Sequence, residues 1–356
     1  MACAILSLLT SCLATPPGWT AGSSSSIVRA ASTAEAESVA EILSNLEPRL
    51  LALVPDSRLD GLEVWVQDQP SLYKKPRPAV ADAEGLWSES HARILVSRHA
   101  DSLERTLAHE LVHAALGDSW RSLPGSLEEG LCDAISARLA PDGAARLRAG
   151  RFSSAALGCG GLTLDLQIVK NGDSTSGDAR RDPGAWSARI ALTSEDLPKE
   201  GHLSVFKVEA GLSSSTLASS TKRGYYGLSY LVIERIIERQ GLVALNELCV
   251  KATRTGHSKI PTAWLLDAAG LSADPATWRA AAVESLGVEE VIQLLTMYPG
   301  FVVDSLVDFL VDTGGNDLEG IRADLQLAGA DVVVEVTQLA FIRDHVEASL
   351  AERSKL

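Results

Sequence analysis

Residues 101–117 carry the strongest helical pattern of the chain, so the helix over this segment is the most firmly predicted element. Its apolar side chains recur every three or four residues and line one face: Leu103, Leu107, Leu111 and Ala114. This spacing is that of an amphipathic helix. Asp101 is suited to the N-cap position, Glu104 three residues later completes a capping box, and Gly117 is a natural end.

Two histidines and a glutamate lie on this predicted helix in the order His-Glu-x-x-His. His109 and His113 are four residues apart, so their imidazoles lie on the same face of a helix and can bind one metal ion. Glu110 lies beside them, where a carboxylate can act as general base toward water. Two surface histidines on an amphipathic helix are the alternative explanation.

A zinc site that catalyses a reaction needs a third protein ligand and leaves one position open. Downstream of His113, the segment Leu127–Ile135 contains Glu128 and Glu129, followed by a glycine. Together with the His-Glu-x-x-His motif, this segment resembles the gluzincin metallopeptidases, whose third zinc ligand is a glutamate on a following helix. The resemblance implies that Glu129, which precedes the glycine, is that ligand.

The choice between the two glutamates depends on a hydrogen bond to the first histidine. In thermolysin-like gluzincins an aspartate four residues after the ligand glutamate accepts the other N–H of that histidine and fixes its ring. Glu129 has Asp133 at this spacing, whereas Glu128 has Cys132, a poor acceptor. The thiolate of Cys132 can bind zinc in principle, but we interpret Cys132 as a small buried residue where the family has alanine.

The same resemblance assigns roles to a strand and a tyrosine. The segment Gly85–Arg98 resembles the strand that borders the substrate cleft in the family, although an interior strand without substrate contact explains it equally well. The segment 226–241 resembles a later helix, from which a tyrosine or histidine donates a hydrogen bond to the tetrahedral intermediate. Tyr226 is our candidate donor, and its packing in an aromatic stripe is the alternative. Three other side chains stay open as donors: Tyr225, His202 and His257.

The resemblance implies an α+β fold with a zincin-like catalytic core, in which a twisted sheet packs with the active-site helix, followed by a mostly helical C-terminal region. It also implies one Zn²⁺ per chain, held by His109, His113 and Glu129, and hydrolysis of peptide bonds with Glu110 as general base. Peptides or proteins are then the substrates. The alternatives are an inactive protein of the same fold that binds or scaffolds a partner, an exported helical protein without metal, and a metal hydrolase of non-peptide amides.

Four segments of the chain differ in composition and pattern. Residues 1–26 are predicted as a signal or lipoprotein segment with a linker, and residues 27–157 as the catalytic subdomain. Residues 158–224 are rich in Gly and Ser and resemble an insertion, and residues 225–356 are predicted to be helical. The catalytic subdomain is expected to contain a helix over 32–54 and strands over 62–67 and 92–97. The insertion-like segment has strand-like runs at 162–169, 188–192 and 203–208.

The first dozen residues are apolar and small, and Leu9-Thr-Ser-Cys12 resembles a bacterial lipobox. The resemblance predicts export and makes Cys12 a candidate lipid anchor, although the basic residues of a signal peptide are missing before Arg29. A disordered N-terminus is the alternative. The net charge of −14 disfavours nucleic acid as a partner. No stretch reaches the roughly 20 apolar residues that span a bilayer.

Overall fold

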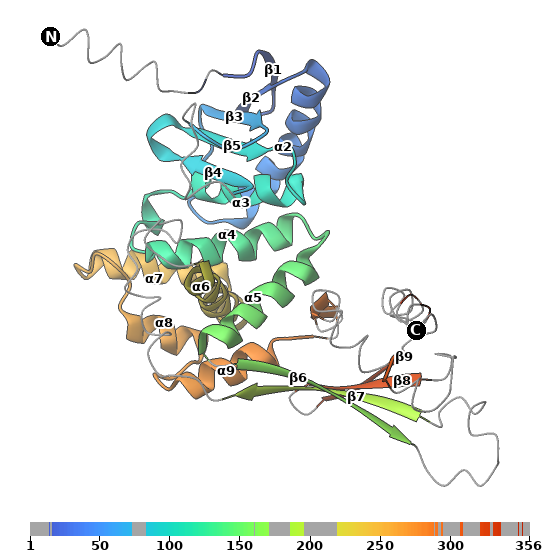
Figure 1. Ribbon diagram of the computed structural model, residues 1–356. Helices are drawn as coiled ribbons and strands as arrows, with labels where there is room; N and C mark the ends of the chain where they lie inside the picture. Colours follow the sequence, from blue (N-terminus) through green and yellow to red (C-terminus); the bar gives the residue numbers. More distant parts are fainter. Residues whose placement is uncertain are drawn as a thin grey trace, which may run out of the picture. The chain divides into compact units, whose positions relative to one another are not determined.

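The computed structural model of this chain has a mixed α+β fold, in agreement with the fold class predicted from the sequence (Figure 1). The structure describes residues 16–72, 83–159, 161–170, 186–195, 219–287, 321–327 and 330–335, with a few single residues and pairs beside them. The chain divides into two compact units. The first comprises residues 1–144 and 202–273, and the second comprises residues 145–201 and 274–356.

The first unit combines a sheet with a group of helices. Its elements in chain order are β1 (Trp19–Gly22), β2 (Ser26–Ala30), α2 (Thr33–Leu53), β3 (Leu62–Gln67), β4 (Gly85–Ser88), β5 (Arg93–Ser97), α3 (Leu103–Ala115), α4 (Gly125–Leu139), α6 (Ser219–Gln240), α7 (Leu242–Arg254) and α8 (Thr262–Ala269). Short 3-10 turns at 89–91 and 118–120 connect some of them.

The five strands of this unit form one sheet with the order β1-β2-β3-β5-β4. Strands β2, β3 and β5 are parallel, and the outer strands β1 and β4 are antiparallel to their neighbours. Val28, Val64 and Ile94 are aligned across the three central strands and are fully buried. Alternate residues of a strand share a face, so this row defines the apolar face of the sheet. Helices α2 and α3 both contact the sheet, and α3 contacts the edge strand β4.

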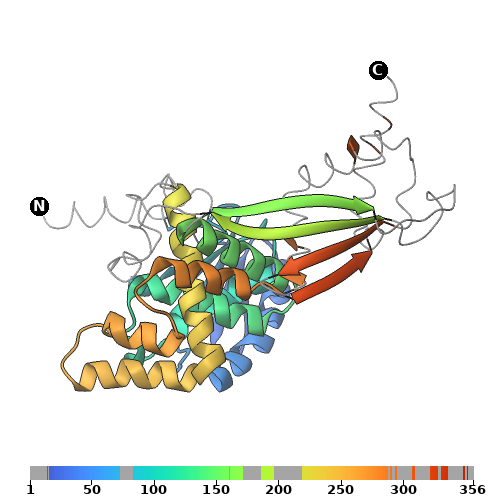
Figure 2. The same cartoon turned by 90° about the horizontal axis from the view of Figure 1, so that it is seen from below.

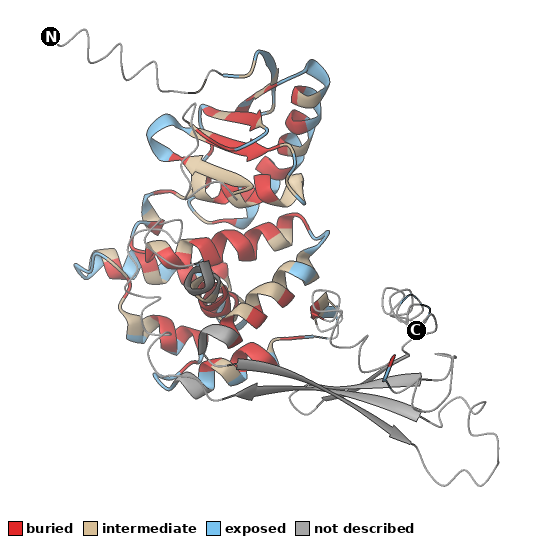
Figure 3. Cartoon of the chain, in the orientation of Figure 1, coloured by how far each residue is buried: buried red, intermediate tan, exposed pale blue. Residues whose placement is uncertain are grey.

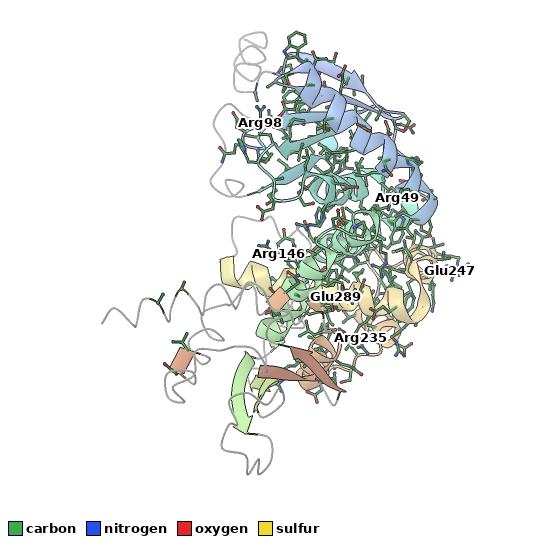
Figure 4. All side chains as sticks on the ribbon, turned by 90° about the vertical axis from the view of Figure 1, so that its right-hand side faces the viewer. Arg49, Arg98, Arg146, Arg235, Glu247 and Glu289 are labelled. Atoms are coloured by element: carbon green, nitrogen blue, oxygen red, sulfur yellow. The ribbon has the colours of Figure 1, made fainter. Side chains whose placement is uncertain are left out.

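A buried carboxylate joins α2 to the turn between β1 and β2. The side chain belongs to Glu47, which is fully buried. Four donors reach it: the hydroxyls of Ser23 (2.7 Å), Ser24 (2.5 Å) and Ser26 (2.6 Å), and the backbone N–H of Ser25 (3.0 Å). The serine run that the sequence predicted as part of a linker is therefore folded onto α2. The opposite face of α2 is polar, and Arg49 points outward from it (Figure 4).

From α3 onward, each helix of the first unit packs against an earlier helix of the same unit. Helix α3 packs on α4, α4 on α6, and α6 on α7 and α8. An ion pair of 2.9 Å joins Arg138 on α4 to the buried Glu234 on α6. Helices α3 and α4 are buried over most of their length (Figure 3). Helix α6 begins before the predicted boundary at residue 225 and belongs to the same unit as the His-Glu-x-x-His segment, not to a separate helical region.

The second unit contains four strands and two helices among its described residues. Its elements are α5 (Ala144–Cys159), β6 (Gly161–Lys170), β7 (Trp186–Glu195), α9 (Pro275–Glu284), β8 (Ile321–Leu327) and β9 (Ala330–Glu335). The strands form a sheet in the order β6-β7-β8-β9, with β7 and β8 parallel and the outer pairs antiparallel (Figure 2).

Strands β8 and β9 were not predicted and lie within the region 225–356, for which the sequence predicts a mostly helical structure. The sequence of β8 alternates strictly, because apolar residues at 321, 323, 325 and 327 are separated by Arg322, Asp324 and Gln326. This two-residue period is that of a strand. The β-branched run in β9 favours a strand as well.

Several other elements agree with the sequence-based predictions. Strand β3 has the predicted bounds, β5 begins one residue later than predicted, and α2, β6 and β7 differ from their predictions by one to three residues at each end. Cys12, His202 and the strand-like run at 203–208 lie outside the described residues. Among the helices that the structure describes, none is long and apolar enough to cross a membrane.

Candidate metal centre

The His-Glu-x-x-His segment lies on α3, and its apolar stripe faces the protein interior. Leu107 and Leu111 of this stripe are fully buried. The N-cap is Ser102 and not Asp101, because the helix begins one residue later than predicted and the Ser102 hydroxyl accepts a hydrogen bond from the backbone N–H of Arg105. The helix ends at Ala115, two residues before Gly117.

Helix α4 carries the acidic residues that the sequence singled out, and its position is fixed by close contact with α6. The backbone N–H of Gly130 donates to the Ser229 hydroxyl at 2.9 Å, and this hydroxyl donates to the carbonyl of Ser126 at 2.6 Å. A Cβ atom at Gly130 would lie 2.5 Å from the backbone of Ser229. The glycine after Glu129 is therefore needed for the approach of α6 to the helix that bears this glutamate.

One carboxylate oxygen of Glu129 lies close to both histidines. Its Oε2 atom is 3.4 Å from Nε2 of His109 and 3.6 Å from Nε2 of His113. Two ligand atoms that bind a tetrahedral zinc at about 2.0–2.2 Å are about 3.3–3.6 Å apart. Both distances therefore fit a shared zinc ion. The three side chains are 12–18% exposed.

The other nitrogen of each histidine meets a second carboxylate. Nδ1 of His109 is 3.0 Å from Oδ1 of Asp133, the contact expected from the spacing of Glu129 and Asp133. Nδ1 of His113 is 2.7 Å from Oε1 of Glu128. An Nδ1–H that donates to a carboxylate leaves the Nε2 lone pair available for a metal. From the sequence we considered Glu128 only as a rival ligand, so its contact with His113 was not expected.

The same carboxylates hold protons on the histidines when no metal is bound. Burial lowers the pKa of His109, but hydrogen bonds with Asp133 and Glu129 outweigh burial and raise this pKa to about 9. Burial also lowers the pKa of His113, but its contacts on α4 with Cys132, and then with Glu128 and Glu129, raise it well above its usual value. For Glu129, burial favours a higher pKa, but the two histidines hold it far below its usual range. A metal ion at Nε2 must therefore displace protons.

The side chain of Glu110 lies against the edge strand β4, where a Cβ atom added at Gly85 would be 2.5 Å from its Oε1 atom. Its side chain is buried, and burial raises the pKa of its carboxyl group against the opposing charges of His109 and His113. The backbone N–H of Trp87 on β4 donates a hydrogen bond to it. A raised pKa is what a general base needs to work near neutral pH.

Cys132 lies next to the same histidines. Its sulfur and one nitrogen each of His109 and His113 are all within 4.8 Å of one another. The side chain is fully buried, and burial raises the pKa of its thiol. Cys132 is thus a small buried residue, as expected, but its sulfur also lies within reach of a metal that the histidines bind.

The candidate donors to a tetrahedral intermediate have different positions. Tyr226 is partly exposed on α6, three residues before Ser229, which contacts α4 next to Glu129. Tyr225 precedes it on the same helix. His257 lies in the turn after α7, where its ring packs edge-on against Trp264.

Comparison of the chain with protein-family models, curated proteins and solved structures finds no match. The chemistry of the site has to be argued from its donor atoms. Two imidazole nitrogens and one carboxylate oxygen form a ligand set that zinc prefers, and they leave a fourth position of a tetrahedron. The buried carboxylate of Glu110 adds a proton acceptor beside them. Together these groups can activate water for attack on an amide.

Proposed function

We propose that this chain is a zinc-dependent metallopeptidase with a zincin-like core. The observation that carries the proposal is the position of Glu129 Oε2, 3.4 Å and 3.6 Å from the Nε2 atoms of His109 and His113. These three residues come from two separate helices, and each of the two distances is compatible with ligand atoms that share a zinc ion.

His109, His113 and Glu129 would hold the zinc ion, and Asp133 and Glu128 would fix the two imidazole rings. When bound, zinc supplies a Lewis acid that lowers the pKa of water to about 7 and polarises a carbonyl group. The side chains of the site are largely buried. Burial lowers the local dielectric constant and strengthens electrostatic interactions within the site.

Glu110 would move the proton during hydrolysis. Its carboxylate accepts a proton from the attacking water while the water oxygen bonds to the carbonyl carbon of the substrate. When the C–N bond breaks, Glu110 delivers this proton to the leaving amine nitrogen. The raised pKa of Glu110 favours both halves of this transfer near neutral pH.

Two further parts of the site concern the substrate. We assign to Tyr226 the hydrogen bond from its hydroxyl to the oxygen of the tetrahedral intermediate, a contribution of about 3 kcal/mol for one such donor. Strand β4 is an edge strand of its sheet, and Glu110 lies beside it. An extended peptide can add to such a strand by backbone hydrogen bonds, which favours a peptide over other amides as substrate.

The test compares the full chain with its Glu110→Gln variant on a mixed peptide library, with cleavage read by mass spectrometry and zinc measured in both proteins. Glu110→Gln should keep its zinc and lose turnover by about 100- to 10,000-fold. Glu104→Gln, on the same helix, is the matched control and should cleave like wild type. Full activity of Glu110→Gln would contradict the proposal.

The position of Cys132 favours a second candidate function. Binding of its thiolate would close the fourth position, and a closed site stabilises a fold without catalysing a reaction. The protein would then be an inactive zincin-like module that binds or scaffolds a partner. Replacement of zinc by Co²⁺ distinguishes a site closed by Cys132 from an open catalytic site, because only a thiolate ligand gives an intense charge-transfer band in the near ultraviolet. The Cys132→Ala variant shows whether such a band comes from this residue.

A further inference from the structure

We propose that Gly85 is a positioning residue that leaves the space in which Glu110 holds its carboxylate against strand β4. The inference rests on the proposed function, since Glu110 is the base assigned there. A Cβ atom at Gly85 would lie 2.5 Å from Oε1 and 2.8 Å from Cγ of Glu110. Neither distance is compatible with packed atoms, so even a methyl group requires the carboxylate or the strand to move.

The strand is less free to move than the carboxylate, because it is tied to α3 on both sides of Gly85. Directly before it, Glu84 accepts hydrogen bonds from the backbone N–H of Asp101 at 3.3 Å and from the Thr106 hydroxyl at 3.1 Å. Two residues after it, the backbone N–H of Trp87 donates to Glu110 itself. An alanine at position 85 therefore displaces the Glu110 carboxylate and breaks its bond to Trp87.

An alanine at position 85 would also contact Thr106 on α3, and the experiment must distinguish this contact from the one with Glu110. The same Cβ atom would lie 2.9 Å from Cγ2 of Thr106. Thr106→Ser removes this methyl group and keeps the hydroxyl that binds Glu84. A Gly85→Ala/Thr106→Ser variant thus relieves the contact with the helix alone, whereas Gly85→Ala/Glu110→Ala relieves the contact with the carboxylate.

The experiment measures zinc content, kcat, KM and thermal unfolding for these variants of the full chain. Gly85→Ala should keep its zinc and lose about 100-fold in kcat with little change in KM, since a displacement of about 1 Å has this effect on a reacting group. Gly85→Ala/Thr106→Ser should not recover this loss. Gly22→Ala is the matched control, because its Cβ atom would be 4.0 Å from the nearest atom of the same sheet, and it should behave as wild type.

Thermal unfolding gives a readout that does not depend on turnover. Gly85→Ala should lower the Tm less in the Glu110→Ala background than in wild type, and a Gly85→Ala protein that folds only in that background shows the same coupling. Wild-type kcat in Gly85→Ala, recovery by Thr106→Ser, or equal Tm losses in both backgrounds would overturn the proposal. Absence of zinc and turnover in the wild-type protein would refute the proposed function, and the positioning role with it, even if the Tm coupling were observed.

Discussion

Nδ1 of His109 on α3 lies 3.0 Å from Oδ1 of Asp133 on α4, 24 residues later in the chain. This contact orients the Nε2 atom of the ring toward Glu129, from which it is 3.4 Å away. It connects the two helices at the point where the proposed ligands meet. Asp133 is buried, so its carboxylate has little contact with water to replace this bond.

Asp133→Asn should therefore weaken zinc binding without abolishing it. An amide is a weaker acceptor for the Nδ1–H of His109 than a carboxylate is. Loss of such a partner typically lowers metal affinity by about 10- to 100-fold, and we expect a decrease in this range. Competition with a chromophoric chelator measures the change. Asp142→Asn, in the exposed loop after α4, is the control and should leave the affinity unchanged. Equal affinities for Asp133→Asn and wild type would mean that this bond does not support the site.

The two adjacent glutamates of α4 should respond differently to substitution. Glu129→Ala removes a proposed ligand and should abolish zinc binding at stoichiometric concentrations. Glu128→Gln keeps a hydrogen-bond acceptor for Nδ1 of His113 and should retain zinc with an affinity that is about tenfold lower. Metal analysis after dialysis distinguishes the two variants. Unchanged zinc in Glu129→Ala would place the third ligand elsewhere, with Cys132 as the nearest candidate.

Zinc affinity should rise with pH through the neutral range. The pKa of His109 in the metal-free protein is about 9, so the ring carries a proton at pH values below this, and zinc must displace it. For each proton displaced, the apparent association constant should fall by about tenfold per pH unit as the pH drops below about 9. Calorimetry in two buffers of different ionisation enthalpy counts the protons released. An affinity that is independent of pH between about 6 and 8 would contradict protonated histidines in the metal-free state.

The buried carboxylate of Glu47 should make a large contribution to the stability of the first unit. In Glu47→Ala, the hydroxyls of Ser23, Ser24 and Ser26 lose their acceptor, and we expect a loss of about 3 kcal/mol in the free energy of unfolding. Urea denaturation measures it. Glu41→Ala, at an exposed position of the same helix, should change the free energy by less than about 0.5 kcal/mol. Similar values for the two variants would show that the serine turn is not held by Glu47.

Local sequence patterns predicted the elements that carry the proposed site. The stripe through Leu107 and Leu111 identified α3, and the helical spacing placed His109 and His113 on one face. The contact of Asp133 with His109 was expected from the resemblance to gluzincins, in which an aspartate four residues after the ligand glutamate accepts this N–H. The inferences about α3 and its two histidines needed only the geometry within a single helix.

What the sequence did not predict depends on how elements pack. The contact of Glu128 with His113 follows from the placement of α4 beside α3, and the steric role of Gly85 follows from the placement of β4 against Glu110. Glu47 is far from the serine run in sequence, so the run was interpreted as a linker. Strand β8 was missed for a different reason: its alternation was present in the sequence but was overridden by the helical patterns before it.

The most direct test of the account is the amount of zinc per chain in the full-length protein, purified without added metal or chelator and measured by elemental analysis. We expect about one zinc per wild-type chain and essentially none in Glu129→Ala. A wild-type protein that contains no zinc and takes up none on titration would contradict it. The convergence of His109, His113 and Glu129 would then be a buried ion pair that stabilises the contact between α3 and α4.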